Sequence, residues 1–378
     1  MKRVLLLGST GSIGRTTLRV LEELGHSHTL VGLAAGRNGS ALVDQVRANP
    51  GLEAVAVADP SVAQDVQRAL PEHKVLSGPD SAAQIVAKVK ADVVVAGITG
   101  AAGLASSMAT LESGADLALA NKESMVLAGP VLSKLARERG ARIIPVDSEH
   151  SAIYQCLQGQ RLEAVRRIVL TASGGPFRTS TREQIANATP EQALDHPTWN
   201  MGAKITIDSA SLMNKALEVI EARWLFDQPA SKIAAVVHPQ SIVHSMVEYR
   251  DGSILAQLGV PDMAVPIRYS LSYPERSETK DSYFDLERFS TLTFEAPDTD
   301  RFPSLSLGFE AARLGGLAGA VLNAANEVVV QRFLDRDISF PDIPRICAQV
   351  LGSMKQIEEP TLDQLLAADL WAREEAAG

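Results

Sequence analysis

The sequence has few of the features that mark secreted, membrane-spanning or nucleic-acid-binding proteins. Its two cysteines, Cys156 and Cys347, lie far apart without metal-type spacing, which predicts a reducing compartment and argues against a disulfide framework. No apolar run reaches the roughly 18 residues that a transmembrane helix needs. The net charge of −9 argues against a general nucleic-acid binder, because phosphates would be repelled outside local basic patches.

The N-terminal segment MKRVLLLGSTGS is too short in apolar residues to be the core of a signal peptide. We therefore expect it to be the first strand of a cytoplasmic protein. At 378 residues, with 46% hydrophobic and 21% charged residues, the chain has the size and composition of about two or three globular domains.

The pattern along the chain predicts three domains. Residues 1–147 alternate helix-length stretches with runs rich in Val, Leu and Ala, which indicates a parallel sheet covered on both faces, a Rossmann-like α/β domain. Residues 148–274 mix period-two strand patterns with a long helix at 208–226 and predict an α+β domain. We expect residues 275–303 to be a linker, although 290–297 also reads as a strand, and residues 304–378 to be a C-terminal helical bundle.

A glycine loop joins the first predicted strand to the first helix, with Gly8, Gly11 and Gly14 spaced three apart. This context is typical of a dinucleotide-binding site, although a tight turn that binds nothing is the alternative. The second predicted strand ends with Arg37 and Asn38 rather than with a carboxylate. A cation there suits a 2′-phosphate and favours NADP(H) over NAD, unless Arg37 is only a solvated loop charge.

Carboxylates gather after the predicted strand ARIIP, where Asp147 and Glu149 lie two residues apart. On a strand they would share a face, so the segment is a metal site, an acid/base pair or a solvated loop. Glu218 in the predicted helix 208–226 offers a third oxygen ligand, and three carboxylates suit Mg²⁺ or Mn²⁺. In that helix Ser211, Asn214, Lys215 and Glu218 share a face that suits a phosphorylated polyol; simple solvent exposure is the alternative.

Nine motifs in consistent order between about residues 2 and 335 resemble the 1-deoxy-D-xylulose 5-phosphate reductoisomerase family. They are GSTGSIG, LANKES, PVDSEHSAI, SGGPF, HPTWNMG, DSASLMNKALEVIEA, HPQSIVHSMVEYRDGS, AQLGVPDM and LNAANE. The resemblance implies an NADPH- and metal-dependent enzyme of the non-mevalonate isoprenoid pathway. It also implies a homodimer, a lid loop around 196–204, and sensitivity to fosmidomycin.

The resemblance implies a role for individual residues as well. The implied NADPH contacts are Thr10, Gly11, Ser12, Ile13, Gly36, Arg37, Asn38, Asn121, Glu123 and Gly202. The implied metal ligands, for Mg²⁺, Mn²⁺ or Co²⁺, are Asp147, Glu149 and Glu218, which with Lys122 are also the expected catalytic residues. The implied substrate contacts are Lys122, Ser148, Glu149, Ser173, His196, Ser209, Asn214, Lys215 and Glu218.

The reaction implied is the rearrangement and reduction of 1-deoxy-D-xylulose 5-phosphate to 2-C-methyl-D-erythritol 4-phosphate. Two other classes compete with it. A simple NADP-dependent dehydrogenase of another phosphorylated or dicarboxylic substrate, such as a semialdehyde dehydrogenase, needs a nucleophilic cysteine in a suitable turn. An NADP-sensing regulator would not need three carboxylates and a lysine beside its cofactor. The partner expected is a small phosphorylated sugar, with no nucleic acid and no membrane.

Overall fold

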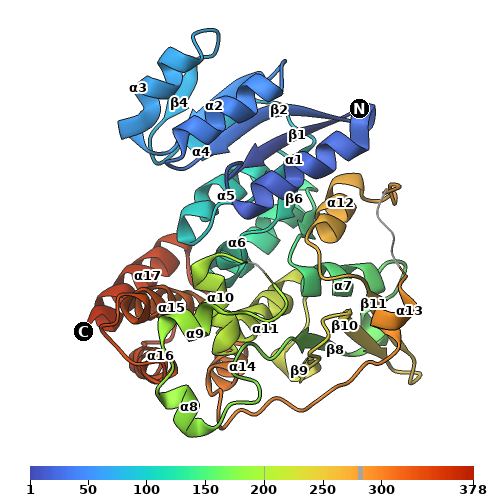
Figure 1. Ribbon diagram of the computed structural model, residues 1–378, viewed down its shortest axis with the longest axis vertical. Helices are drawn as coiled ribbons and strands as arrows, with labels where there is room; N and C mark the ends of the chain where they lie inside the picture. Colours follow the sequence, from blue (N-terminus) through green and yellow to red (C-terminus); the bar gives the residue numbers. More distant parts are fainter. Residues whose placement is uncertain (200, 280–283) are drawn as a thin grey trace. The chain divides into compact units, whose positions relative to one another are not determined.

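The computed structural model describes residues 1–199, 201–279 and 284–378, and the chain divides into two compact units (Figure 1). Unit 1 comprises residues 1–124, 132–151 and 262–282, and unit 2 comprises residues 125–131, 152–261 and 283–378. Both units are built from discontinuous segments. The three-domain division with boundaries at 147, 274 and 303 stays a prediction.

Unit 1 contains a parallel sheet of seven strands among its described residues, in the order β4-β3-β2-β1-β5-β6-β7. The strands are β1 (Lys2–Leu7), β2 (His28–Ala35), β3 (Ala54–Val57), β4 (Val75–Ser77), β5 (Val93–Ala96), β6 (Asp116–Leu119) and β7 (Ile143–Pro145). The helices are α1 (Ser12–Leu24), α2 (Gly39–Ala48), α3 (Pro60–Ala69), α4 (Ser81–Lys88), α5 (Leu104–Glu112) and α12 (Ala264–Ser272). Two further helices, α6 (Lys122–Arg139) and α7 (Ser148–Cys156), have residues in both units.

The first strand shows why helices cover both faces of this sheet. Val4 and Leu6 point into one apolar core with residues of α1, α2 and α3, whereas Leu5 and Leu7 point into a second core with residues of α4. All four side chains are fully buried, and a strand buried on both faces is expected to be continuously apolar. The Rossmann-like fold predicted for this part of the chain is confirmed.

The sheet order places β1 between β2 and β5, so the chain first adds β2 to β4 on one side of β1 and then β5 to β7 on the other. In an open parallel sheet, ligands bind beyond the carboxyl ends of the strands at such a reversal. The glycine loop after β1 therefore lies where a dinucleotide is expected.

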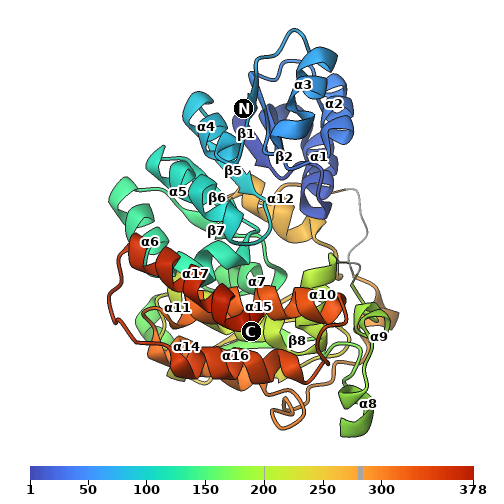
Figure 2. The same ribbon diagram turned by 90° about the vertical axis from the view of Figure 1, so that its left-hand side faces the viewer.

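Unit 2 contains a mixed sheet in the order β11-β10-β8-β9, packed with helices. The strands are β8 (Val165–Ala172), β9 (Ile233–Val237), β10 (Val243–Tyr249) and β11 (Ile254–Leu258). The helices are α8 (Arg182–Ala186), α9 (Pro190–Leu194), α10 (Ala203–Ala210), α11 (Met213–Leu225), α13 (Leu286–Phe289), α14 (Ser304–Leu314), α15 (Ala318–Leu334), α16 (Asp342–Ser353) and α17 (Leu362–Ala377). Figure 2 shows α14 to α17 as the stacked helices predicted for the C-terminal region.

Two sequence predictions in unit 2 are wrong. The strand expected at 290–297 is only an isolated bridge between Glu295 and Val237, and Pro297, which has no N–H to donate, follows it closely. The single helix expected over 208–226 is two helices, because Leu212 adopts a left-handed conformation with φ 57° between α10 and α11. No helix in the described part of the chain has both the length and the apolar character to span a membrane.

Candidate functional site

The glycine loop of unit 1 is shaped by close backbone approaches. Gly8 has φ +77°, and a Cβ built on it would lie 2.4 Å from the carbonyl oxygen of Gly97, which follows β5. A Cβ on Gly14 would lie 2.3 Å from the carbonyl oxygen of Ser9. Helix α1 then begins after Gly11, and no side chain of the described residues caps it. The positive end of the helix dipole therefore faces the loop, as an anion-binding loop requires.

The loop after β2 presents an exposed Arg37 beside Asn38. The Asn38 side chain caps α2 by accepting from the backbone N–H of Ala41 at 3.2 Å, so its first task is structural. No sequence pattern pointed to Asp59, which follows the neighbouring strand β3. Hydrogen bonds from the hydroxyl and the N–H of Ser61 lower the pKa of Asp59, so this carboxylate is used to cap α3.

The loop after β6 is held by Asn121. Its Oδ1 accepts from Ser124 N at 2.9 Å, and its Nδ2 donates to the Gly100 carbonyl and to Glu123 Oε2, both at 3.0 Å. Asn121 thus caps α6 and links the loops that follow β5 and β6. Lys122 is the first residue of α6 and is buried.

Lys122 and Asp147 form the central ion pair of unit 1, with 2.8 Å between Nζ and Oδ2. The other oxygen, Oδ1, accepts from the backbone N–H groups of Glu149 at 3.1 Å and His150 at 3.3 Å. The His150 Nδ1 lies 3.2 Å from the same oxygen, which gives this histidine a contact that the sequence alone did not provide. The Asp147 carboxylate is therefore held by Lys122 on one oxygen and by the first N–H groups of α7 on the other.

The expectation that Asp147 and Glu149 share the face of a strand is wrong. Strand β7 ends at Pro145 and α7 begins at Ser148, so Asp147 precedes the first helical turn. Its carboxylate accepts hydrogen bonds from the otherwise unpaired N–H groups of that turn, which is the usual role of an N-cap aspartate. Ser148 Oγ donates to Glu149 Oε2 at 2.7 Å.

In unit 2 the structure brings together three of the predicted substrate contacts. His196 Nε2 lies 3.1 Å from Ser173 Oγ and 3.1 Å from Ser209 Oγ. Its Nδ1 accepts from the backbone N–H groups of Thr198 at 3.1 Å and Trp199 at 2.9 Å. Because Nδ1 accepts, the proton lies on Nε2 and points toward the serines. Burial lowers the pKa of His196, which also favours the neutral ring.

Two glycines after β8 permit this convergence. Gly174 and Gly175 have φ of +87° and +67°, and a Cβ on Gly175 would lie 2.7 Å from the carbonyl oxygen of Ser209. The Gly175 N–H donates to Ser173 Oγ at 3.2 Å. A side chain at position 175 would therefore push α10 away from Ser173, which follows β8.

Helix α11 carries Asn214, Lys215 and Glu218 on one face, as predicted. Asn214 Nδ2 donates to Glu218 Oε1 at 2.7 Å, and Lys215 Nζ forms an ion pair with Glu218 Oε2. Lys215 and Glu218 are buried, so the simple solvent-exposed alternative is wrong for them. Ser211 does not share this face, because it ends α10 and donates to the Ile207 carbonyl at 3.1 Å.

The predicted lid loop contains Trp199, whose ring lies at a tilt with its centroid 6.4 Å from that of His244 on β10. Asn200 lies outside the described residues. Gly202 ends the loop as the residue before α10.

Both cysteines are buried and free of disulfides. Burial raises the pKa of the Cys156 thiol to about 11 and also raises that of Cys347. A thiol with a raised pKa is a poor nucleophile at neutral pH, which argues against the semialdehyde dehydrogenase alternative.

The predicted metal ligands are all oxygen donors, which is the donor set that Mg²⁺ and Mn²⁺ prefer. Within each unit a lysine now lies beside the carboxylate: Lys122 at Asp147 in unit 1, and Lys215 at Glu218 in unit 2. The chemistry of these oxygen donors therefore suits a divalent cation. The complete ligand set and the other residue roles stay predictions.

Comparisons with known proteins cover nearly the whole chain. The 1-deoxy-D-xylulose 5-phosphate reductoisomerase model matches residues 4–129, the model of that enzyme's C-terminal domain matches 143–226, and the DXP reductoisomerase C-terminal domain model matches 258–375. The chain is 51% identical to the 1-deoxy-D-xylulose 5-phosphate reductoisomerase of Chlorobaculum tepidum and 52% identical to that of Chlorobium chlorochromatii, over 100% of this chain and 99% of each relative.

Solved structures give the same result. The enzyme from Zymomonas mobilis in complex with NADPH matches with a TM-score of 0.93 and 43% identity, over 100% of this chain and 98% of that one. A DOX-P reductoisomerase in complex with NADPH, fosmidomycin and magnesium matches with a TM-score of 0.94 and 38% identity, over 100% and 97%. Taken with the residues above, these matches establish that the chain belongs to the 1-deoxy-D-xylulose 5-phosphate reductoisomerase family.

Proposed function

We propose that the chain converts 1-deoxy-D-xylulose 5-phosphate to 2-C-methyl-D-erythritol 4-phosphate with NADPH and Mg²⁺ or Mn²⁺. The observation that carries this proposal is the pairing of a buried lysine with a candidate metal ligand in each unit, at Lys122–Asp147 and Lys215–Glu218. A divalent cation at the carboxylates would release both lysines toward an anionic substrate. A simple hydride transfer would not need such an arrangement.

NADPH is assigned to unit 1. The glycine loop and the uncapped start of α1 suit its pyrophosphate, and Arg37 suits the 2′-phosphate. Asn121 and Glu123, which hold the loop after β6, are the proposed contacts at the nicotinamide end. The Zymomonas mobilis relative was solved with this cofactor.

The substrate phosphate is assigned to unit 2, where Ser173, His196 and Ser209 converge. The neutral imidazole keeps one N–H at Nε2, so it orients an anion without adding charge. Lys215 supplies the positive charge and Asn214 a hydrogen bond to a hydroxyl. Fosmidomycin, present in a related structure, is a phosphonate and fits the same donors.

When bound, the metal ion supplies Lewis acidity and NADPH supplies the hydride. Asp147, Glu149 and Glu218 would hold the ion, and Ser148 would orient the substrate beside it. Lys122 would stabilise the negative charge that develops on the substrate oxygen. Trp199, in the loop that follows His196, would exclude water from the reacting carbons.

We also propose that the protein is a homodimer that pairs through β11. This strand is a sheet edge, and Ile254, Leu255 and Leu258 on it are exposed by 58, 42 and 42%. An exposed apolar edge strand pairs readily with another chain, and a second copy would offer the same edge. Leu255→Lys should give a monomer in light scattering; a dimer that persists would contradict this interface.

The proposed reaction is tested by following NADPH absorbance with 1-deoxy-D-xylulose 5-phosphate, with and without chelator. Oxidation that requires both the substrate and Mg²⁺ or Mn²⁺ is expected. No oxidation with the metal present would contradict the reaction, whereas activity after thorough metal removal would contradict the carboxylate site. Glu218→Gln should lose far more rate than NADPH affinity.

A further inference from the structure

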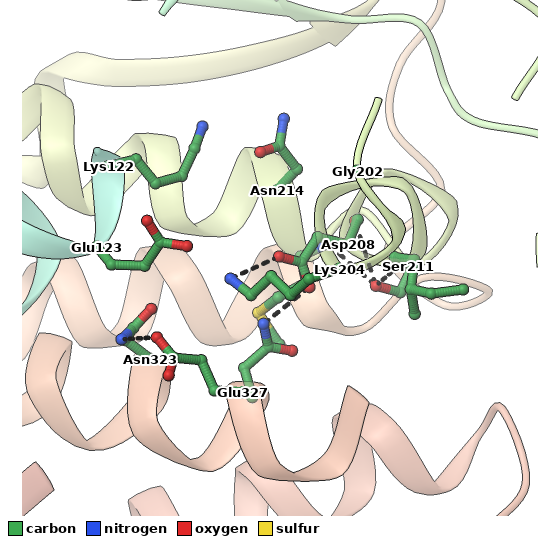
Figure 3. Close-up of polar contacts among 12 residues, drawn as sticks. Lys122, Glu123, Gly202, Lys204, Asp208, Ser211, Asn214, Asn323 and Glu327 are labelled. Atoms are coloured by element: carbon green, nitrogen blue, oxygen red, sulfur yellow. Dashed lines mark hydrogen bonds and ion pairs between the residues drawn. The ribbon is translucent and has the colours of Figure 1, made fainter. Parts of the chain in front are cut away.

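A buried polar cluster in unit 2 lies next to the proposed phosphate site but includes none of the proposed substrate or cofactor contacts. Asp208 on α10 is 1% exposed. Its Oδ2 lies 2.8 Å from Lys204 Nζ, one turn earlier on the same helix, and its Oδ1 accepts from Asn326 Nδ2 on α15 at 2.8 Å. Figure 3 shows Lys204 reaching the Asp208 carboxylate. Helices far apart in the sequence are thus joined through one carboxylate.

The cluster lies on the helix that carries Ser209, one of the proposed phosphate contacts. α10 has only eight residues, and it starts after Gly202 in the predicted lid loop and ends at the break before Leu212. The residue after Asp208 is Ser209, whose hydroxyl lies 3.1 Å from His196 Nε2. A rotation or shift of α10 would therefore move this hydroxyl directly.

Helix α15 is also joined to α17 by a separate set of polar contacts. Glu327, one residue after Asn326, accepts from Asn323 Nδ2 at 3.1 Å and pairs with Arg373 of α17 at 2.8 Å. Arg373 also pairs with Asp369 at 2.7 Å. Figure 3 shows the Asn323–Glu327 contact on the same helix.

Asp208 and Asn326 are better suited to fixing an orientation than to stabilising the fold. A buried carboxylate loses its hydration and is tolerated only where hydrogen bonds and charge replace it. The Oδ1 of Asn326 is buried without a hydrogen-bond partner among the described residues, and such a group costs stability. What Asn326 does provide is a directed donor that fixes the orientation of Asp208.

We propose that Asp208, held by Lys204 and Asn326, is a positioning residue that fixes α10 against α15 and so keeps the Ser209 hydroxyl at His196, where the substrate phosphate binds. The inference rests on the proposed function for its substrate. It concerns substrate binding rather than the chemical step. Loss of the cluster therefore raises KM for the phosphorylated substrate and leaves kcat and KM for NADPH nearly unchanged.

The test is a charge swap across the contact. Asn326→Asp sets two carboxylates against each other and should raise substrate KM at least tenfold, with kcat within about twofold. The double variant D208N/N326D restores an amide-to-carboxylate hydrogen bond and should return KM to within about threefold of the wild type. If Asn326→Asp does not fold, Lys204→Met removes the other contact and should show the same split.

The matched control is Glu327→Gln, which weakens the α15–α17 contacts without touching α10. It should lower Tm and leave substrate KM unchanged. The ¹⁵N signals of His196, assigned by their loss in His196→Asn, should shift in Asn326→Asp but not in the control.

Unchanged KM and unchanged His196 signals in Asn326→Asp would overturn the inference, as would KM changes that merely follow Tm in both variants. If the wild-type protein fails to oxidise NADPH with the substrate, the proposed function fails instead. The His196 signals still test the cluster in that case, because they need no turnover.

Discussion

The two units supply their candidate residues in different ways. In unit 1, the glycine loop, Arg37, Asn121–Lys122 and Asp147 follow β1, β2, β6 and β7, so one parallel sheet brings them to one edge. In unit 2, Ser173 follows a strand, but His196 lies in a loop and Ser209 and Asn214 lie on either side of a helix break. Sheet topology therefore fixes the first group, whereas glycines and unusual backbone angles fix the second.

The largest effect on activity is expected at the carboxyl ends of the strands of unit 1, where Lys122 lies. Lys122→Met removes the ammonium group beside Asp147 and should reduce kcat by about 10³-fold, in the range seen when one donor to a developing oxyanion is lost. Steady-state kinetics with saturating NADPH measures it. Lys134→Met, on the exposed side of the same helix, is the control and should have wild-type kcat. A loss below tenfold would remove Lys122 from the chemical step.

In unit 2, backbone geometry should affect substrate binding as much as the side chains do. Gly175→Ala places a Cβ 2.7 Å from the Ser209 carbonyl oxygen at φ +67° and should raise substrate KM by about thirtyfold, or about 2 kcal/mol. The control, Gly159→Ala, has the same kind of strain at φ +73° but nothing within 4 Å. Similar KM values in the two variants would mean that strain alone, not the approach to Ser209, explains the effect.

A smaller effect is expected at the exposed end of unit 1. Arg37→Gln should raise KM for NADPH about tenfold and leave KM for NADH unchanged, because only NADPH carries the 2′-phosphate. Parallel titrations with the two cofactors measure this difference, and Arg47→Gln on α2 serves as the control. Equal changes for both cofactors would show that Arg37 does not read the phosphate.

The smallest effect concerns the pH dependence of stability in unit 2. Burial lowers the pKa of His196, so between that pKa and about 6.5 the unfolded chain binds more protons than the folded one. The stabilisation from neutral His196 is thus complete above about pH 6.5 and declines as pH falls through this window. Urea unfolding at several pH values should show a smaller decline for His196→Asn than for the wild type. Equal declines would contradict the neutral ring.

The features of the fold that depend on local sequence could be predicted, whereas those that depend on tertiary contacts could not. The parallel sheet and the glycine loop were predictable, because apolar runs and Gly8, Gly11 and Gly14 act locally. The position of Asp147 was misjudged, although an aspartate before Ser148 and Glu149 is a normal helix start. The helix break at Leu212 could not be predicted, because no glycine marks it. A leucine adopts φ 57° only when tertiary contacts hold it there. The Asp208–Asn326 contact joins residues 118 positions apart, which no local pattern reveals.

The proposed reaction both rearranges a carbon skeleton and reduces it. It is tested most directly by incubating ¹³C-labelled 1-deoxy-D-xylulose 5-phosphate with the protein, NADPH and Mg²⁺, and by determining the product's carbon connectivity by NMR. The account predicts the branched 2-C-methyl-D-erythritol 4-phosphate, formed in equal amount to the NADP⁺ released. An unbranched reduced sugar phosphate would contradict it and would indicate a simple dehydrogenase.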